Sequence, residues 1–200
     1  MTAAPTITLA SGSAIRAEML RGAGVDFTVV KPGVDESEIK REAEESGATL
    51  DQIATLLADA KCMAVAKNTP GIVVGSDQIL EFQGRAFDKP ETMAEARKRL
   101  IEMKGATHTL INAVVVARDG DIIWRNLDRP RLTMRDLTEA DIDAYLDAAG
   151  PDILFSVGAY QVEKLGARLF EEIDGNYFAV LGMSLLPLLG VLRREGAIAF

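Results

Sequence analysis

The sequence contains very little cysteine and histidine. Its 200 residues include one cysteine, Cys62, and one histidine, His108. A single thiol cannot form an internal disulfide, which suits a reducing compartment. One histidine excludes a two-histidine metal site, and no motif indicates a cysteine–histidine dyad or a serine–histidine–aspartate triad. His108 begins a strand pattern after Gly105, so we expect a structural histidine with its hydrogen bonds satisfied.

The chain also lacks an excess of positive charge and a long hydrophobic run. Its net charge of −8 argues against a general nucleic-acid-binding protein, which usually has a basic face. The longest apolar stretch, 180–192, is interrupted by glycine, serine and proline and is shorter than the ~20 residues that span a bilayer. It predicts a buried C-terminal helix, and such an apolar helix also allows a homodimer. We expect no interaction with a membrane. Residues 1–13 show no signal-peptide pattern, so we predict a cytoplasmic protein.

The patterns that are present predict an α/β protein. The composition is 48% hydrophobic and 26% charged, and the length fits one domain over residues 1–200. Asp119-Gly120 predicts a hairpin, so we expect a mixed rather than an all-parallel sheet. The periodicities predict helices at 14–23, 37–46, 50–65, 92–104, 138–149 and from 177 onward, and strands at 6–9, 27–30, 72–75 continued by 79–82, 108–117, 122–125, 131–135, 155–162 and 168–173.

The turn Ser11-Gly12-Ser13 is a candidate anion-binding site. It lies between a predicted strand and a predicted helix, where backbone N–H groups attract anions. Its two hydroxyl groups and Arg16, one turn later, could close on a phosphate. The GxxxxGK[ST] pattern of a Walker A loop is absent. The alternative is ordinary helix capping by Ser13, with Arg16 on the surface.

Asp77 is a candidate catalytic or metal-binding carboxylate. It follows the apolar strand at 72–75, and the end of such a strand is where α/β proteins often place active-site residues. A carboxylate there can hold a divalent metal or orient a water. The alternative is a turn or bulge aspartate. The apolar flanks favour the functional interpretation, because an unpaired charge beside a buried strand is costly.

Two lysines could reach phosphate oxygens. Lys89 lies in the loop Asp88-Lys89-Pro90, and the alternative is an exposed loop lysine. Lys61 lies near the predicted apolar face of the helix at 50–65, and the same alternative applies. That face is expected to consist of Ile53, Leu56, Leu57 and Ala60.

Two acidic residues have both functional and structural interpretations. Glu36 lies next to Asp35 at a predicted helix start, and adjacent acids at such a position usually interact with the helix dipole. Glu163 lies on the strand-like segment 158–163 and could ligate a metal or contact a base edge. The alternative for Glu163 is an outward-facing strand residue.

Taken in order, these motifs resemble the Maf family of nucleotide pyrophosphatases, and the match runs from about residue 7 to residue 192. The resemblance implies a two-lobed α/β fold shared with inosine triphosphate pyrophosphatases: a mixed twisted sheet with flanking helices around a central cleft. The matching segments are Leu9-Ala10-Ser11-Gly12-Ser13, Asp35-Glu36, Lys61, Ser76-Asp77, Lys89-Pro90, Gly105-Ala106-Thr107-His108, Gly158-Ala159-Tyr160 and Leu181-Gly182-Met183-Ser184-Leu185.

The resemblance also implies an activity and a set of site residues. The activity is hydrolysis of a nucleoside triphosphate to the monophosphate and pyrophosphate, with Mg²⁺ or Mn²⁺. The implied metal residues are Asp77, also the central catalytic carboxylate, and Glu36. The other implied roles are triphosphate binding by Ser11, Ser13 and Arg16, neutralisation of phosphate charge by Lys61 and Lys89, and substrate contacts by Gln78 and Glu163, with Glu163 bearing on substrate choice.

The chain departs from the family pattern at several positions. Ala14 replaces a proline, and Ile15 stands where many members have an arginine. Gln78 replaces the threonine of the thymidine- and uridine-directed members, and the Gly-Ser-Asp-Gln run and Glu163 look more like the branch acting on 7-methyl-GTP. The missing arginine also fits that branch. Loss of both the arginine and the proline would instead fit a non-catalytic, nucleotide-binding regulator of cell division, although retention of Asp77, Lys61 and Lys89 argues against this alternative. A third interpretation is an inosine-triphosphate-type pyrophosphatase, whose own motifs are not seen.

Overall fold

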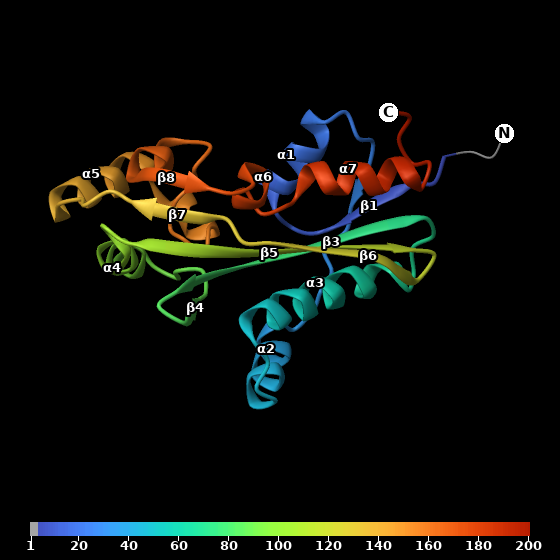
Figure 1. Cartoon of the computed structure of the whole chain (residues 1–200), viewed down its shortest axis with the longest axis horizontal. Helices are drawn as coiled ribbons and strands as arrows, with labels where there is room; N and C mark the ends of the chain where they lie inside the picture. The colour runs from blue at the N-terminus through green and yellow to red at the C-terminus, as the bar shows by residue number, and fades with distance from the viewer. Residues whose placement is uncertain (1–3) are drawn as a thin grey trace. The chain divides into compact units, whose positions relative to one another are not determined.

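The computed structural model describes residues 4–200, which form a mixed eight-stranded sheet (Figure 1). The strand order is β2 (Thr28–Val29), β1 (Ile7–Ala10), β3 (Ile72–Phe82), β5 (Thr107–Arg118), β7 (Arg131–Met134) and β8 (Phe170–Asp174). Off this path, β4 (Arg85–Phe87) pairs with β3, and β6 (Asp121–Asp128) pairs with β5. β1 pairs with β2 and β3 in parallel, whereas the β3–β4, β5–β6, β5–β7 and β7–β8 pairs are antiparallel. Helices flank the sheet. The predicted α/β class and mixed sheet are therefore confirmed.

The chain divides into two compact units. The first combines residues up to Asp77 with Asn112–Asp128 and Gly182–Phe200, and the second combines Gln78–Ile111 with Arg129–Leu181. Two long strands, β3 (Ile72–Phe82) and β5 (Thr107–Arg118), contribute residues to both units. The single domain over residues 1–200 and the central cleft stay predictions, and Met1–Ala3 lie outside the described residues.

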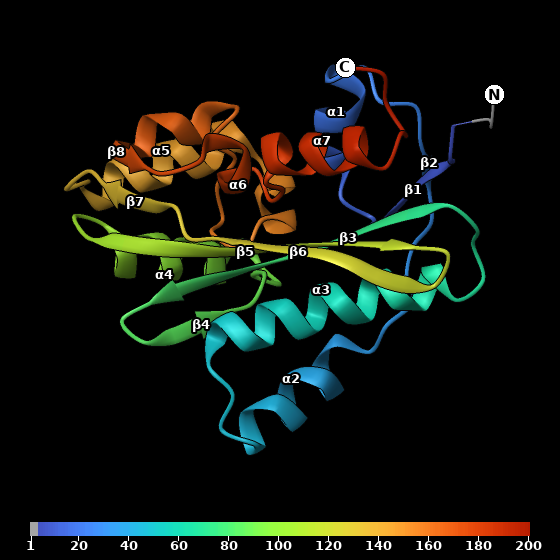
Figure 2. The ribbon, with the colours of Figure 1, turned by 45° about the vertical axis from the view of Figure 1, so that its right-hand side comes forward.

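The first unit is built around a buried strand, β1, which pairs in parallel with β2 and β3. All four residues of β1 are buried, as expected for a parallel strand covered on both faces. Figures 1 and 2 show α1 (Ala14–Gly22) and α7 (Leu185–Arg194) on one face of this part of the sheet and α3 (Leu50–Ala66) on the other. In chain order, the elements of this unit besides its parts of β3 and β5 are β1 (Ile7–Ala10), α1 (Ala14–Gly22), β2 (Thr28–Val29), α2 (Glu36–Glu45), α3 (Leu50–Ala66), β6 (Asp121–Asp128) and α7 (Leu185–Arg194).

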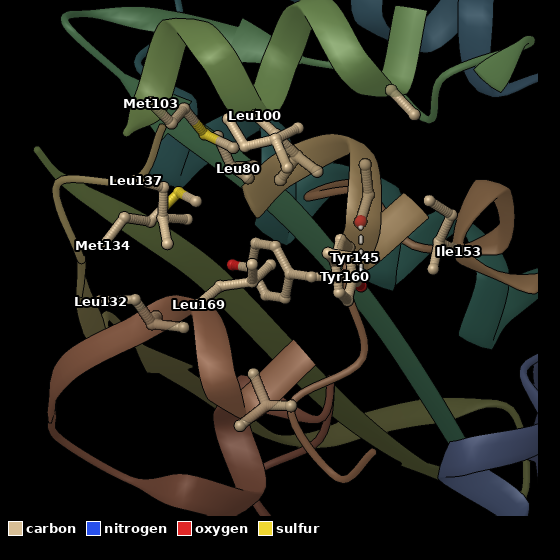
Figure 3. Packing of buried hydrophobic residues seen from close by; sticks show 14 of the residues in the cluster. Leu80, Leu100, Met103, Leu132, Met134, Leu137, Tyr145, Ile153, Tyr160 and Leu169 are labelled. Atoms are coloured by element: carbon tan, nitrogen blue, oxygen red, sulfur yellow. Dashed lines mark hydrogen bonds between the residues drawn. The ribbon is translucent and has the colours of Figure 1, made fainter. Parts of the chain in front are cut away.

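The second unit has its own apolar core. Side chains from β3, α4, α5, β7 and the loops between them converge in this cluster (Figure 3). Its largest fully buried members include Leu80, Leu100, Met103, Leu132 and Met134. The elements of the unit are β4 (Arg85–Phe87), α4 (Met93–Met103), β7 (Arg131–Met134), α5 (Glu139–Ala149), the 3₁₀ helices η1 (Pro151–Phe155) and η2 (Leu165–Leu169), β8 (Phe170–Asp174) and α6 (Tyr177–Val180).

The structure corrects the prediction for residues 72–82. The expected interruption between two short strands is wrong, because β3 runs unbroken through Ser76, Asp77 and Gln78. The polar side chains of these residues are tolerated inside the strand because each has a partner. The Ser76 hydroxyl donates to the Gly182 carbonyl, Asp77 accepts from Lys61, and the Gln78 amide donates to backbone carbonyls. Asp77 therefore lies within the strand rather than at its end.

The predicted strand at 155–162 is also wrong. This segment connects η1 and η2 and pairs with no strand in the described part of the chain. Ala159 has a φ of +58°, in the left-handed region that interrupts extended backbone. Its carbonyl accepts a hydrogen bond from the Tyr145 hydroxyl at 3.3 Å. The apolar alternation here reflects burial in the core of the second unit, not pairing.

Two helix predictions also need correction. The apolar C-terminal stretch forms two helices, α6 and α7, because Gly182 between them has a φ of +102°. On α3, Leu56 is 45% exposed, so the predicted buried face is displaced. The residues buried on α3 are Ile53, Ala54, Leu57, Ala58, Lys61, Cys62, Val65 and Ala66. Among residues 4–200, no helix combines the length and apolarity needed to cross a bilayer.

Candidate active site

The turn after β1 leaves the start of α1 without a side-chain cap. Ser13 occupies the N-cap position, but its side chain makes no capping hydrogen bond, so the capping alternative for its hydroxyl is wrong. Instead, the Ser13 backbone N–H donates to the hydroxyl oxygen of the buried Ser11 at 3.2 Å. A helix N-terminus with uncapped N–H groups and two nearby hydroxyls is a suitable place for an anion.

Arg16 is held against this turn rather than lying on the surface. Its Nε donates to the Gly182 carbonyl at 2.7 Å, and its Nη1 donates to the Ser76 carbonyl at 2.9 Å and the Ser11 hydroxyl at 3.3 Å. Burial lowers the pKa of Arg16, while Asp77 and Glu36 raise it. The guanidinium group is thus a fixed cation within the field of two carboxylates.

Lys61 joins the two predicted metal-binding acids. Its Nζ lies 2.6 Å from Oδ1 of Asp77 and 2.8 Å from Oε1 of Glu36. The Lys61 and Asp77 side chains are only 10% and 9% exposed, whereas that of Glu36 is 45% exposed. Asp35 caps α2 by accepting from two backbone N–H groups, which fixes where Glu36 begins the helix. The structure therefore brings Glu36, Lys61 and Asp77 together.

A close crossing of α3 over β3 makes this contact possible. A Cβ atom at Gly75 would lie 2.7 Å from the Ala58 carbonyl oxygen and from Cys62 Cβ. Only glycine allows the helix to approach the strand this closely, and Lys61 projects from the same helix toward Asp77. Burial raises the pKa of the Cys62 thiol to about 11, so the thiol donates to the Val73 carbonyl and is not a nucleophile at neutral pH.

Asn112 is a buried polar residue that the sequence analysis missed. Its Nδ2 donates to the backbone carbonyl of Asp77 at 3.2 Å, and its Oδ1 accepts from the Ser184 hydroxyl at 3.2 Å. Asn112 and Ser184 are fully buried. An asparagine within the apolar run of β5 was the available signal, because buried amides are kept where they satisfy specific partners. This network fixes the backbone that carries Asp77.

Lys31 is a second missed residue. Carbon atoms of its side chain lie 3.7–4.0 Å from the position that a Cβ would take at Gly12, so its stem covers the anion-binding turn. Ser11 and Lys31 each follow one of two adjacent parallel strands, β1 and β2. The carboxyl ends of parallel strands are the common place for ligand-binding residues, so this placement was open to prediction.

The remaining predicted site residues belong to the second unit. The Gln78 amide nitrogen donates to the carbonyls of Ala179 and Val180 at 2.8 and 3.2 Å, so it is engaged with the backbone. Lys89 is exposed in the loop after β4, and Glu163 is exposed in the segment between η1 and η2. Their roles toward a nucleotide stay predictions.

Glu36 and Asp77 suit a metal ion that is also bound by phosphate oxygens of a substrate. Within residues 4–200, no cluster of three or more histidine, cysteine, aspartate or glutamate side chains could hold a metal ion. Glu36 and Asp77 nevertheless contact the same ammonium group, so their oxygens lie near each other. Mg²⁺ is usually bound through one or two carboxylates plus water and substrate phosphates, and this pair fits that donor set.

Comparison with known proteins identifies similar sequences over nearly the whole chain. The family profile described as "Maf-like protein" matches residues 6–195. A protein of Caulobacter vibrioides named nucleoside triphosphate pyrophosphatase is 44% identical over 192 residues, 96% of each chain. A Brucella suis protein named 7-methyl-GTP pyrophosphatase is 45% identical over 193 residues, 96% of this chain and 97% of its own. A Rhodospirillum rubrum protein named nucleoside triphosphate pyrophosphatase is 42% identical over 195 residues, 97% of this chain and 96% of its own.

Proposed function

Because the chain belongs to the Maf family, we propose that it is a nucleoside triphosphate pyrophosphatase with a preference for 7-methyl-GTP. It would release the nucleoside monophosphate and pyrophosphate. A cytoplasmic location is part of the proposal, since a reducing compartment suits a chain with one cysteine. A homodimer stays a prediction.

The observation that carries the proposal is the position of Lys61 between Glu36 and Asp77, with Arg16 bound to the carbonyl of Ser76 next to Asp77. A chain with a net charge of −8 here brings two cations and an uncapped helix N-terminus to a pair of carboxylates. Polyphosphate chemistry needs this combination, because the cations bind the anionic tail while the carboxylates hold a metal or orient water.

The proposed reaction is hydrolysis at the α-phosphorus. A water oxygen forms a bond to this phosphorus, and the bond from the α-phosphorus to the bridging α–β oxygen breaks. Pyrophosphate leaves with the electron pair, and the proton released by the attacking water passes to solvent. Asp77 orients the water, while Arg16 and Lys61 stabilise the negative charge on the phosphates, as Lys89 is also predicted to do.

A divalent cation completes the proposed site. Asp77 and Glu36 would hold Mg²⁺ or Mn²⁺, which when bound offsets phosphate charge and lowers the pKa of coordinated water. Ser11 and Ser13, with the backbone N–H groups at the start of α1, would bind phosphate oxygens.

The preference for 7-methyl-GTP rests on Glu163 and on relatives with that name. Guanine presents N–H donors on its Watson–Crick edge, and a carboxylate can accept them. Relatives named 7-methyl-GTP pyrophosphatase and relatives named nucleoside triphosphate pyrophosphatase have similar identities, 42–45% among those compared. The names alone therefore do not decide the base. The carboxylate of Glu163 would favour 7-methylguanine over guanine, because methylation at N7 gives the ring a positive charge.

A nucleotide panel with pyrophosphate release as the readout tests the proposal. The wild-type chain should hydrolyse 7-methyl-GTP faster than GTP, UTP, dTTP and CTP, and chelation of Mg²⁺ with EDTA should abolish turnover. Asp77→Asn should lower kcat by about 10³-fold or more, because it removes the residue that orients the nucleophile and holds the metal.

The matched control is Asp59→Asn, which changes an aspartate on α3 that pairs with Arg125 instead. It should keep near wild-type turnover. Asp77→Asn with wild-type kcat would remove Asp77 from the central role. Nucleotide binding by the wild-type chain without any pyrophosphate release would favour the non-catalytic regulator.

A further inference from the structure

One arginine in the second unit joins two loops that carry predicted nucleotide-binding residues. Arg99 lies on α4, and its Nη1 donates to the backbone carbonyls of Asp88 and Val157, the latter at 2.6 Å. Asp88 directly precedes Lys89 in the sequence, and Val157 begins the stretch that leads to Glu163. A single NH₂ group thus connects the loop of the predicted phosphate-binding lysine to the loop of the predicted base-contacting glutamate.

The surroundings of Arg99 show that this cation is fixed in place. Its guanidinium carbon lies 5.0 Å from the centroid of the Phe87 ring, close enough for a cation–π interaction. Its buried Nε has no hydrogen-bond partner in the part of the chain that the structure describes. A partly desolvated cation with an unused N–H group is costly, so the two carbonyl contacts are the favourable interactions that hold it there.

Neither loop has regular structure of its own at the contact. Residues 88–92 and 156–163 belong to no helix or strand. Loops without ladder hydrogen bonds satisfy their backbone groups through turn hydrogen bonds, side chains and water, so a side-chain donor that binds their carbonyls helps to define their conformation. Arg99 is a side chain that contacts the backbone of both loops at once.

We propose that Arg99 is a positioning residue that fixes the Lys89 loop against the Glu163 loop, and so aligns phosphate binding with base selection. This inference rests on the proposed function, because it concerns the same nucleotide. Arg99 acts through the two backbone carbonyls and does not itself touch the reacting atoms.

The experiment compares Arg99→Met with Arg97→Met in the full chain. Arg97 lies on the same helix, but it pairs with Glu139 and Asp143 of α5. Arg99→Met should lower kcat/KM for 7-methyl-GTP by about 10- to 100-fold, the range expected when substrate-positioning groups shift. Arg97→Met should change it by about twofold or less, because exposed ion pairs contribute little.

Two further readouts separate positioning from general stability. The preference for 7-methyl-GTP over GTP should fall in Arg99→Met and stay unchanged in Arg97→Met. In a double-mutant cycle with Lys89→Met, the combined loss should be clearly smaller than the product of the two single losses, because Arg99 acts partly through Lys89. Arg99→Lys should recover part of the activity, since an ammonium group can also donate to two carbonyls.

Equal kcat/KM and equal base preference in Arg99→Met and Arg97→Met would overturn the proposal. A wild-type chain that hydrolyses no nucleoside triphosphate would overturn the proposed function instead. Hydrogen exchange then still tests the bridge: faster exchange of residues 88–92 and 156–163 in Arg99→Met than in Arg97→Met supports it, and equal exchange contradicts it.

Discussion

His108 is a buried histidine with only half of its hydrogen-bonding capacity used. Its Nε2 lies 2.6 Å from the Tyr160 hydroxyl, but its Nδ1 has no partner among the described residues. The expectation of a fully satisfied structural histidine is therefore wrong for one ring nitrogen. The ring also packs 5.6 and 5.9 Å from the rings of Tyr160 and Phe170, measured between centroids. These apolar surroundings favour the neutral imidazole.

This environment predicts a pH-dependent loss of stability. Burial lowers the pKa of His108 to about 4, whereas an unfolded histidine titrates near 6.5. Between these values the unfolded chain binds a proton that the folded chain does not, so stability is full above pH 6.5 and falls as the pH drops toward 4. His108→Gln should remove a component of about 3 kcal/mol from the fall in unfolding free energy over this window.

Urea unfolding of both proteins at pH 7 and at pH 4.5 measures this effect. The carboxylates titrate in both proteins, so the comparison isolates His108. An identical decrease in the two proteins would show that His108 does not hold its pKa below the ordinary value.

For single residues, the sequence predicted which charged side chains belong to the site better than it predicted which residues they contact. Asp77 and Lys61 were identified singly, because a charge beside an apolar strand or helix face is unusual. Their direct contact was not predictable, since it depends on how closely α3 crosses β3. Asn112 was missed because one amide inside an apolar run has no periodicity. Its role follows only from the carbonyl of Asp77 that it meets in the fold.

The site of the first unit depends on how closely helix α3 crosses strand β3. A methyl group at Gly75 would overlap the Ala58 carbonyl oxygen and Cys62 Cβ, both at 2.7 Å. The overlap involves backbone as well as side-chain atoms, so α3 must move away from the strand to relieve it. Lys61 on α3 would then move away from Asp77 on β3.

Gly75→Ala should therefore lose both stability and activity. We expect about 1–3 kcal/mol of destabilisation, the usual cost of overpacking. We also expect kcat/KM to fall by about 10-fold or more from the displaced lysine. Gly22→Ala is the matched control, because a Cβ there meets nothing within 4 Å. Thermal unfolding and pyrophosphate release measure the two effects, and normal turnover in a stable Gly75→Ala protein would contradict the coupling.

Helices and strands were predicted correctly where the hydrophobic pattern of a segment has a single structural explanation. The helices at 50–65, 92–104 and 138–149 were predicted within a residue or two. In the structure Thr49, Thr92 and Thr138 cap them, so local capping and apolar spacing lead to the same boundaries. The strand predicted at 155–162 was wrong because alternating burial also arises in an irregular loop packed on a core. The short strand β4 was missed because its hairpin turn is Gln83-Gly84. Both residues have positive φ, as in a tight hairpin turn, but the sequence there lacks the Asn-Gly or Asp-Gly pair that usually indicates one.

For the whole molecule, the central electrostatic problem is an acidic chain that must bind a polyanion. A net charge of −8 repels a nucleoside triphosphate at long range, and salt screens this repulsion over about 8–10 Å. In the proposed site, affinity would therefore come from local cations, helix N–H groups and the proposed metal, and composition alone cannot reveal their arrangement. The predicted family, class and mixed sheet were readable from ordered motifs, whereas the contacts between Glu36, Lys61 and Asp77 required the fold.

Binding of a metal–nucleotide complex should consequently stabilise the folded chain. A non-hydrolysable 7-methyl-GTP analogue with Mg²⁺, at about 100 times its Kd, should add about 2.7 kcal/mol to the unfolding free energy. For a chain of this length, that energy raises Tm by roughly 5–10 °C.

The dependence of this shift on Mg²⁺ identifies its source, because Lys61 and Arg16 would bind phosphate even without a metal. In the wild-type chain, the shift should shrink when EDTA replaces Mg²⁺. In Asp77→Asn it should be small and insensitive to Mg²⁺, because one carboxylate of the pair is missing, whereas Asp59→Asn should behave like wild type. A full Mg²⁺-dependent shift in Asp77→Asn would show that the metal is held elsewhere and that Asp77 serves only the chemical step.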